Sequence, residues 1–167
     1  MKAPICVTLL LLLTGCLPFH TTRSGAPPPF SRVLVVSKLT RITPAYLTAW
    51  QRAFPGEYTV CAVDAGPMSF GNPDSLVQQQ IQQCKPDVLL TVSTLQNNQG
   101  QVGRYSYNQN DVLLELVTLP DRRAFWKGVL TTPATSRNAV DPFRVVEQLK
   151  RDGVIAGTLP KSYALTN

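Results

Sequence analysis

Apolar and polar residues alternate along this chain in segments that predict strands and helices in turn. Val33-Leu34-Val35-Val36 is a short uninterrupted apolar run, which is typical of a strand covered on both faces. Thr43-Pro44 supplies an N-cap and a first-turn proline, and apolar residues then recur at helical spacing up to the stop at Pro55-Gly56. We therefore expect a strand at residues 33–36 followed by a helix that ends near Phe54.

The strand-and-helix pattern repeats once more and leads into a third strand. Tyr58–Val63 is rich in β-forming residues and ends in a loop signal at Asp64-Ala65-Gly66-Pro67. Asn72-Pro73 opens a second helix with one apolar face and a cluster of glutamines, which we interpret as its solvated face. The apolar run in Asp87–Val92 then predicts a third buried strand.

Beyond residue 92 the chain is rich in β-forming segments until a last helix. We expect a loop at residues 96–103, a β-segment at Val102–Tyr107, and an antiparallel hairpin of Val112–Leu119 with Ala124–Thr131. Asp141-Pro142 opens a final helix that ends before Gly153. The element order β-α-β-α-β-β-β-α, which does not count the short segment Val102–Tyr107, predicts a single α/β (α+β) domain with a mixed β-sheet, built in two or three layers.

The N-terminus carries a targeting signal. Lys2 precedes the nine-residue apolar run Ile5–Leu13, which is too short to cross a hydrocarbon core of about 30 Å. Leu13-Thr14-Gly15-Cys16 resembles the lipobox of bacterial lipoproteins at every position. The resemblance implies that residues 1–15 are a signal peptide removed before Cys16, and that Cys16 receives diacylglycerol on its thiol and an acyl chain such as palmitate on its new N-terminus.

The segment after Cys16 reads as a linker to the folded part. Residues 16–31 contain Pro27-Pro28-Pro29 and little that could build a core, so we expect a lipid anchor and an extended tether there, with the domain at residues 32–167. Two acyl chains make attachment to the lipid bilayer stable. By resemblance to enterobacterial lipoproteins, Leu17 in place of an aspartate favours the outer over the inner membrane, with the domain facing the periplasm.

The net charge and the positions of the basic residues limit the kinds of binding partner that we expect. The chain carries a net charge of +6, and +5 without residues 1–15, with its basic residues scattered rather than clustered. This pattern gives a weak attraction to anionic surfaces such as lipid head groups or wall polymers. It does not support nucleic-acid binding, which leaves a clustered basic footprint.

Cysteine and histidine positions limit the chemistry. Without the signal peptide, Cys61 and Cys84 are the one pair beyond Cys16; they could form a disulfide or be two small buried hydrophobes. His20, the single histidine, falls in the expected tether, so we expect no imidazole in the folded domain. That would exclude Ser–His and Cys–His nucleophiles and histidine zinc sites, and we expect no metal and no cofactor.

Few other residues suggest a site. Asp64 follows a central strand, where open α/β sheets bind ligands, although a turn explains it as well. Lys38 and Arg41 precede the capped helix start and could contact an anion, or they are two solvated loop charges.

One further resemblance concerns function. Phe125-Trp126-Lys127-Gly128 resembles the apolar-Trp-basic-Gly hairpin of envelope lipoproteins such as the curli-secretion lipoproteins and the lipoprotein activators of penicillin-binding proteins. It implies a non-catalytic accessory protein of envelope assembly or secretion whose partner is an envelope protein or wall polymer. Two alternatives stay open: a ligand-binding module or carboxylate-based enzyme near Asp64 and the loop at 96–103, and a self-assembling ring component forming a homo-oligomer.

Overall fold

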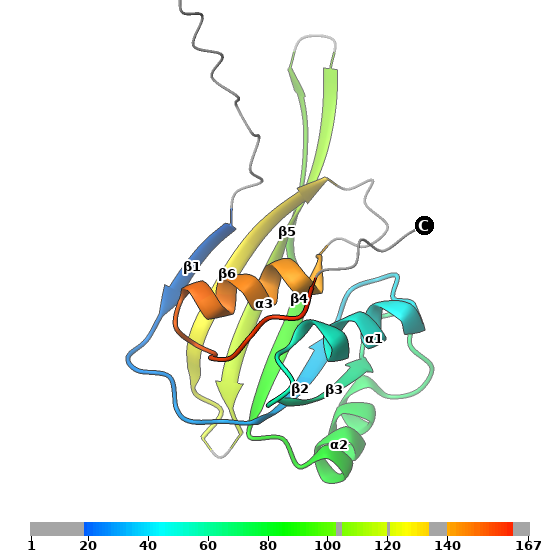
Figure 1. Cartoon of the computed structure of the whole chain (residues 1–167). Coiled ribbons are helices and arrows are strands. Elements are labelled where there is room, and N and C mark those ends of the chain that lie inside the picture. The colour runs from blue at the N-terminus through cyan, green and yellow to red at the C-terminus, as the bar shows by residue number, and fades with distance from the viewer. Residues whose placement is uncertain (1–18, 103–104, 120, 134–139, 162–167) are drawn as a thin grey trace, which may run out of the picture.

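The computed structural model describes residues 19–102, 105–119, 121–133 and 140–161. Within them a six-stranded sheet is combined with three helices (Figure 1), which confirms the α/β class and the mixed sheet. The elements are β1 (Phe19–Arg23), β2 (Arg32–Ser37), α1 (Pro44–Ala53), β3 (Thr59–Asp64), α2 (Pro73–Cys84), β4 (Val88–Val102), β5 (Tyr105–Thr118), β6 (Ala124–Pro133) and α3 (Pro142–Arg151). From β2 to α3 the order is the predicted β-α-β-α-β-β-β-α, and β1 precedes it.

The strands lie in the order β1-β6-β5-β4-β2-β3. β2 is parallel to both β3 and β4, whereas the β4–β5, β5–β6 and β6–β1 pairs are antiparallel. It follows that β1 begins at the end of the sheet at which β2, β3 and β4 finish. We call this end the hairpin end, because the β4–β5 hairpin rises from it (Figure 1). The predicted β5–β6 hairpin is confirmed, with Val112 opposite Leu130.

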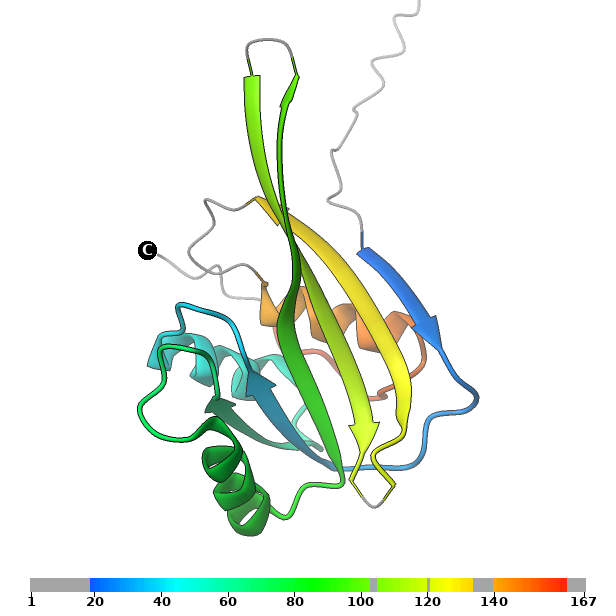
Figure 2. The same cartoon turned by 180° about the vertical axis from the view of Figure 1, so that it is seen from behind.

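The helices cover the sheet unequally. α1 and α3 lie on one face, over the main apolar core, while α2 lies on the other face against β2 and β3 (Figures 1 and 2). The core under α2 is small and centres on Leu34, Val36 and Val63. Among the described residues, no helix covers that second face of β5, β6 and β1 (Figure 2). The domain is therefore three layers deep over β2 and β3 and two layers deep over the remaining strands.

The helix starts agree with the sequence prediction because their caps are local. The Thr43 hydroxyl accepts from the backbone N–H of Tyr46, and proline occupies the first turn of every described helix. Asn72 and Asp141 cap α2 and α3 in the same way through side-chain oxygens. Each cap satisfies an N–H group that the first turn leaves without a helical partner.

The loop expected at residues 96–103 is wrong as far as the structure describes that segment. Gln96–Val102 continues β4 and pairs with β5 up to Val102 opposite Tyr105, with one irregularity between Thr94 and Gln96. The expected β-segment Val102–Tyr107 therefore contains the end of one strand and the start of the next. Glutamine and asparagine have low strand propensity, but pairing across the ladder supplies the backbone hydrogen bonds that local propensity does not.

The segment expected to be a tether also differs. Phe19–Arg23 is the edge strand β1, paired with β6 from Phe19 opposite Leu130 to Arg23 opposite Trp126. His20 consequently lies in the folded domain, exposed on β1, which corrects the expectation of a domain without imidazole. Cys16 and the expected signal peptide lie outside the described residues.

Candidate functional site

The most informative site is the place where β1 docks, because it fixes how the N-terminal segment reaches the domain. The half-buried Phe19 ring meets the Trp126 indole edge-on, with ring centroids 6.4 Å apart. A β-carbon at Gly128 would lie 2.7 Å from Phe19 Cε2 and 2.8 Å from Trp126 Cη2. Gly128 therefore leaves the space in which both rings sit, and this is the physical content of the Trp-Lys-Gly pattern.

The end of α3 completes this docking site. The Trp126 indole N–H donates to the Asp152 carboxylate at 2.7 Å, and an Arg23 guanidinium N–H donates to the Asp152 backbone carbonyl, also at 2.7 Å. Asp152 is the C-cap residue of α3, so one residue holds both β1 and β6 against that helix. Trp126 is 1% exposed, and its buried N–H needs this partner. We call Phe19, Arg23, Trp126, Gly128 and Asp152 the β1 dock.

After β1 the chain crosses the end of the sheet opposite the hairpin end (Figure 1). These residues, 24–31, are bound to the domain at both ends: the Ser24 N–H donates to the Phe125 carbonyl at 2.9 Å, and the Ser31 N–H donates to Asp87 Oδ2 at 2.9 Å. Between them the Phe30 ring packs on Phe125 and Tyr58. The proline-rich segment is thus a strap across the domain instead of a free tether.

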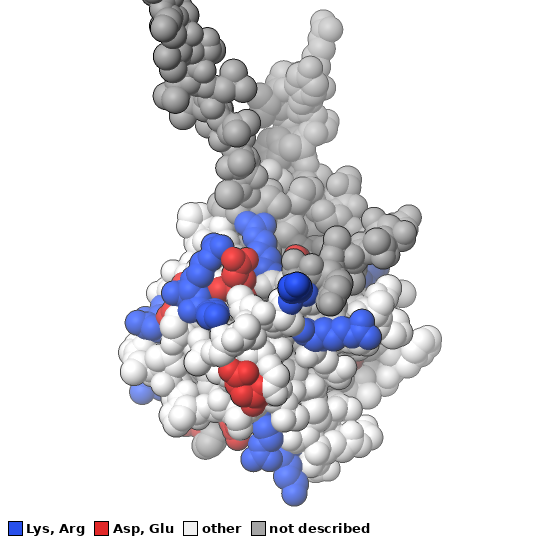
Figure 3. Space-filling view, viewed as in Figure 1, with Lys and Arg blue, Asp and Glu red and all other residues white. Residues whose placement is uncertain are grey.

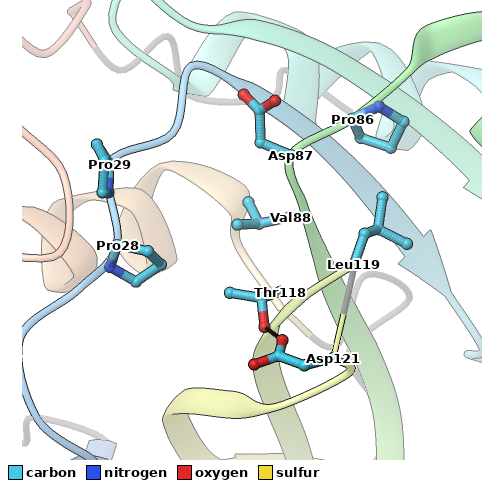
Figure 4. Close-up of a pocket in the computed structure, with 8 residues that line it drawn as sticks. All are labelled: Pro28, Pro29, Pro86, Asp87, Val88, Thr118, Leu119 and Asp121. Carbon is cyan, nitrogen blue, oxygen red and sulfur yellow. Dashed lines mark hydrogen bonds between the residues drawn. The ribbon is translucent and has the colours of Figure 1, made fainter.

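A cleft of about 540 Å³ lies between this strap, the start of β4 and the end of β5 (Figure 4). Two aspartates line it, and both have structural partners. Asp87 accepts from the backbone N–H groups of Ser31 and Arg32, which lowers its pKa. Asp121 accepts from the Thr118 hydroxyl, which likewise lowers its pKa. Both carboxyl groups are ionised at neutral pH, which does not suit a general acid.

Asp64 lies in a turn where the loops after β2 and β3 meet. Asp64 Oδ1 accepts from the Gly66 N–H at 2.9 Å, and the Ala65 N–H donates to the Ser37 carbonyl at 2.8 Å. A β-carbon at Gly66 would overlap the Leu39 carbonyl oxygen, so the loops after β2 and β3 are in direct contact. The structure therefore places Asp64 in a turn, at the strand end where the sequence put it.

Lys38 and Arg41 lie exposed on the loop between β2 and α1. Among the described residues, no hydrogen bond or ion pair joins either side chain to Asp64. The expected contact of Lys38 and Arg41 with an anion stays a prediction. Figure 3 shows lysines and arginines spread over the face that carries α1 and α3, with acidic residues between them. This distribution agrees with the scattered basic residues of the sequence.

Cys61 on β3 and Cys84 at the end of α2 are joined by a disulfide, with their Cα atoms 6.5 Å apart. The disulfide links the C-terminal end of α2 to the edge strand β3. Within the described part of the chain no three His, Cys, Asp or Glu side chains are grouped as a metal site would need. No helix in the described segments is long and apolar enough to cross a bilayer.

Comparisons with known proteins give likenesses in structure only. No protein-family model matches the chain, and no curated protein matches it in sequence. Among solved structures, the chain is similar to the PelC dodecamer from Paraburkholderia phytofirmans, with 14% identity, a TM-score of 0.45, and coverage of 79% of this chain and 96% of that one. It is also similar to the lipoprotein GNA1162 from Neisseria meningitidis, with 14% identity, a TM-score of 0.40, and coverage of 74% and 95%. Likenesses at this level do not indicate the function of this chain.

Proposed function

We propose that this protein is a lipid-anchored component of the bacterial cell envelope, held on a bilayer through acylated Cys16. Its α/β domain would act as a non-catalytic accessory or binding protein in envelope assembly or secretion, with the outer membrane favoured by Leu17. The proposal rests on the lipobox residues and on the short stretch of sequence between Cys16 and the start of β1.

The observation that carries the proposal is the short distance between Cys16 and the dock. Two residues separate Cys16 from Phe19, where β1 begins. Three extended residues span at most about 11 Å. With β1 docked, an acylated Cys16 would hold the domain directly at the bilayer surface, and two acyl chains would make that attachment stable.

The roles of the described carboxylates support a binding rather than a catalytic function. Asp64 caps its own turn, Asp87 holds the strap, and Asp121 closes the β5–β6 turn through Thr118. Each of these three side chains accepts hydrogen bonds that hold a local structure. A partner that binds the surface leaves all three in place.

The anchor is tested by replacing the acyl acceptor. In a bacterial host that processes lipoproteins, Cys16→Ala should abolish acylation and leave residues 1–15 uncleaved. Cys6→Ala is the matched control, because it removes a cysteine from the same terminal segment and leaves Cys16 intact. Intact mass should show a chain beginning at a diacylated Cys16 in the wild type and in the control. An acylated Cys16→Ala protein, or a wild-type protein with an unmodified Cys16, would overturn the proposal.

The partner is identified by crosslinking in intact cells, followed by purification of the anchored protein and mass spectrometry. We expect an envelope protein in stoichiometric amount. Recovery of the chain itself in multiples would support the self-assembly hypothesis. Recovery of an uncrosslinked monomer would count against a protein partner and favour a small ligand or a polymer.

A further inference from the structure

The β4–β5 hairpin extends beyond the rest of the sheet. β2 pairs with β4 only as far as Ser37 opposite Val92, and β6 pairs with β5 only as far as Pro133 opposite Gln109. Past these points, among the described residues, the two strands pair with each other alone, and the hairpin projects from the body (Figures 1 and 2). We call residues 96–102 and 105–108, whose outer backbone edges have no neighbouring strand among the described residues, the ribbon.

The ribbon projects from the end of the sheet at which β1 begins. Phe19 lies opposite Leu130, Leu130 opposite Val112, and Val112 opposite Thr94, so the first residue of β1 and Thr94 stand at one level of the sheet. Because β1 starts at the hairpin end, Phe19 lies at the end of the sheet from which the ribbon rises (Figure 1).

Measured from the level of Phe19 and Thr94, the ribbon is longer than the greatest distance at which Cys16 can lie. From the Thr94–Val112 pair to the Val102–Tyr105 pair the ladder advances seven residues along β5, or about 23 Å at the usual strand rise. Cys16 precedes Phe19 by three residues and lies at most about 11 Å from it. If the strands stood perpendicular to the membrane, the ribbon would therefore pass the anchor point by about 12 Å.

A membrane cannot accept the ribbon at that depth. The head-group layer is only about 5–7 Å thick on each side of the hydrocarbon core. Residues 96–101 are Gln-Asn-Asn-Gln-Gly-Gln, and the outer backbone edges of the ribbon have no neighbouring strand over Gln96–Gly100 and Tyr105–Asn108. Amides and open strand edges do not enter hydrocarbon, where nothing satisfies their hydrogen bonds.

We infer that the sheet is tilted on the membrane so that the ribbon lies along the lipid head groups of the leaflet that holds Cys16. This inference deepens the proposed function and rests on acylation of Cys16. The residue types of the ribbon suit that layer, because amide and hydroxyl groups can hydrogen-bond to phosphate and glycerol oxygens. The position of the anchor, three residues before Phe19, is what favours lipid over a second copy of the chain as the occupant.

The test uses tryptophan as a contact probe in the full, acylated chain. Trp50 and Trp126 are 0% and 1% exposed, so they give a background that membrane lipid does not reach. Tyr107→Trp and Asn108→Trp place probes at two adjacent positions of the ribbon. Gln82→Trp is the matched control, since it is exposed near the end of α2, four residues before Pro86 and the start of β4 at the opposite end of the sheet.

Each variant is reconstituted in vesicles of phosphatidylethanolamine and phosphatidylglycerol, with or without bromine on the upper acyl carbons. We expect bromine to quench the added emission of one or both ribbon probes and to leave that of Gln82→Trp unchanged. Unquenched ribbon probes on a chain whose mass shows diacylated Cys16 would overturn the inference and leave the proposed function standing. Equal quenching of the control would overturn it too, because no fixed face would then meet the lipid.

Two further results separate the remaining cases. If the ribbon probes shift to the blue in a lipid-free oligomer and are not quenched in vesicles, the ribbon binds a second copy and the inference is overturned. If intact mass shows an unmodified Cys16, the anchor is absent, and both the inference and the proposed function are overturned.

Discussion

Replacing Gly128 with alanine should loosen β1, because the added β-carbon enters space that the β1 dock already occupies. It would lie 2.7 Å from Phe19 Cε2 and 2.8 Å from Trp126 Cη2, whereas carbon atoms pack best at about 3.5–4.0 Å. One of the two rings must move by several tenths of an ångström or more. Trp126 is buried and donates to Asp152, so the half-buried Phe19 on the edge strand should yield.

The expected cost follows from this geometry. Overpacking of a well-filled site typically destabilises a protein by about 1–3 kcal/mol. Expulsion of Phe19 limits the strain but gives up part of the roughly 1.5–3 kcal/mol that full burial of such a side chain contributes. We therefore expect Gly128→Ala to lower the free energy of unfolding by about 1–3 kcal/mol and to lower Tm by roughly 2–4 °C for each kcal/mol.

Urea unfolding measures the loss, and amide hydrogen exchange over residues 19–23 shows whether β1 is the part that opens. Gly56→Ala is the matched control, because no atom lies within 4 Å of its added β-carbon. Phe19→Ala combined with Gly128→Ala should cost less than the sum of the two single changes, since removal of the ring frees one of the two contacts. Unchanged stability and unchanged exchange in Gly128→Ala, or strictly additive costs in the double variant, would refute the reasoning.

Three further predictions concern the disulfide, the strap and a helix cap. Reduction of the Cys61–Cys84 bond, which closes a separation of 23 residues, should lower the free energy of unfolding by about 3 kcal/mol; equal urea midpoints with and without reductant would contradict this. The Asp87 pKa is lowered from 3.8 by backbone N–H groups, so this carboxylate stabilises the fold above that pH and the contribution is lost as the pH falls below it. Asp87→Asn should therefore be less stable than wild type at pH 7 and should lose less stability on acidification, as followed by unfolding at a series of pH values, whereas an unchanged pH profile would argue against the prediction. Thr43→Ala removes the cap of α1 and should cost about 0.5–2 kcal/mol in thermal unfolding, while Thr43→Ser keeps the hydroxyl; an equal loss in both would show that the cap is not the cause.

The candidate site was only partly predictable. The motif Phe125-Trp126-Lys127-Gly128 was visible in the sequence as a resemblance, but nothing local showed that Gly128 makes room for the ring of Phe19. The sequence Phe-His-Thr-Thr-Arg has no apolar alternation, and its pairing with β6 joins residues more than 100 positions apart. Asp87 was expected only at the entry of a strand, and its role in holding the strap depends on the path of residues 24–31.

The sequence by itself determined the helices and the strands of the central sheet. Thr43-Pro44, Asn72-Pro73 and Asp141-Pro142 set helix starts through hydrogen bonds that reach only two or three residues, and apolar runs such as Val33–Val36 have no other way to be buried. Only the tertiary structure decided β1, the strap and the ribbon. Their residues have weak local preferences. β1 and the strap are held by hydrogen bonds and ring contacts to segments far away in sequence, whose energy exists only once the sheet has formed, whereas the ribbon is held by pairing between its own two strands.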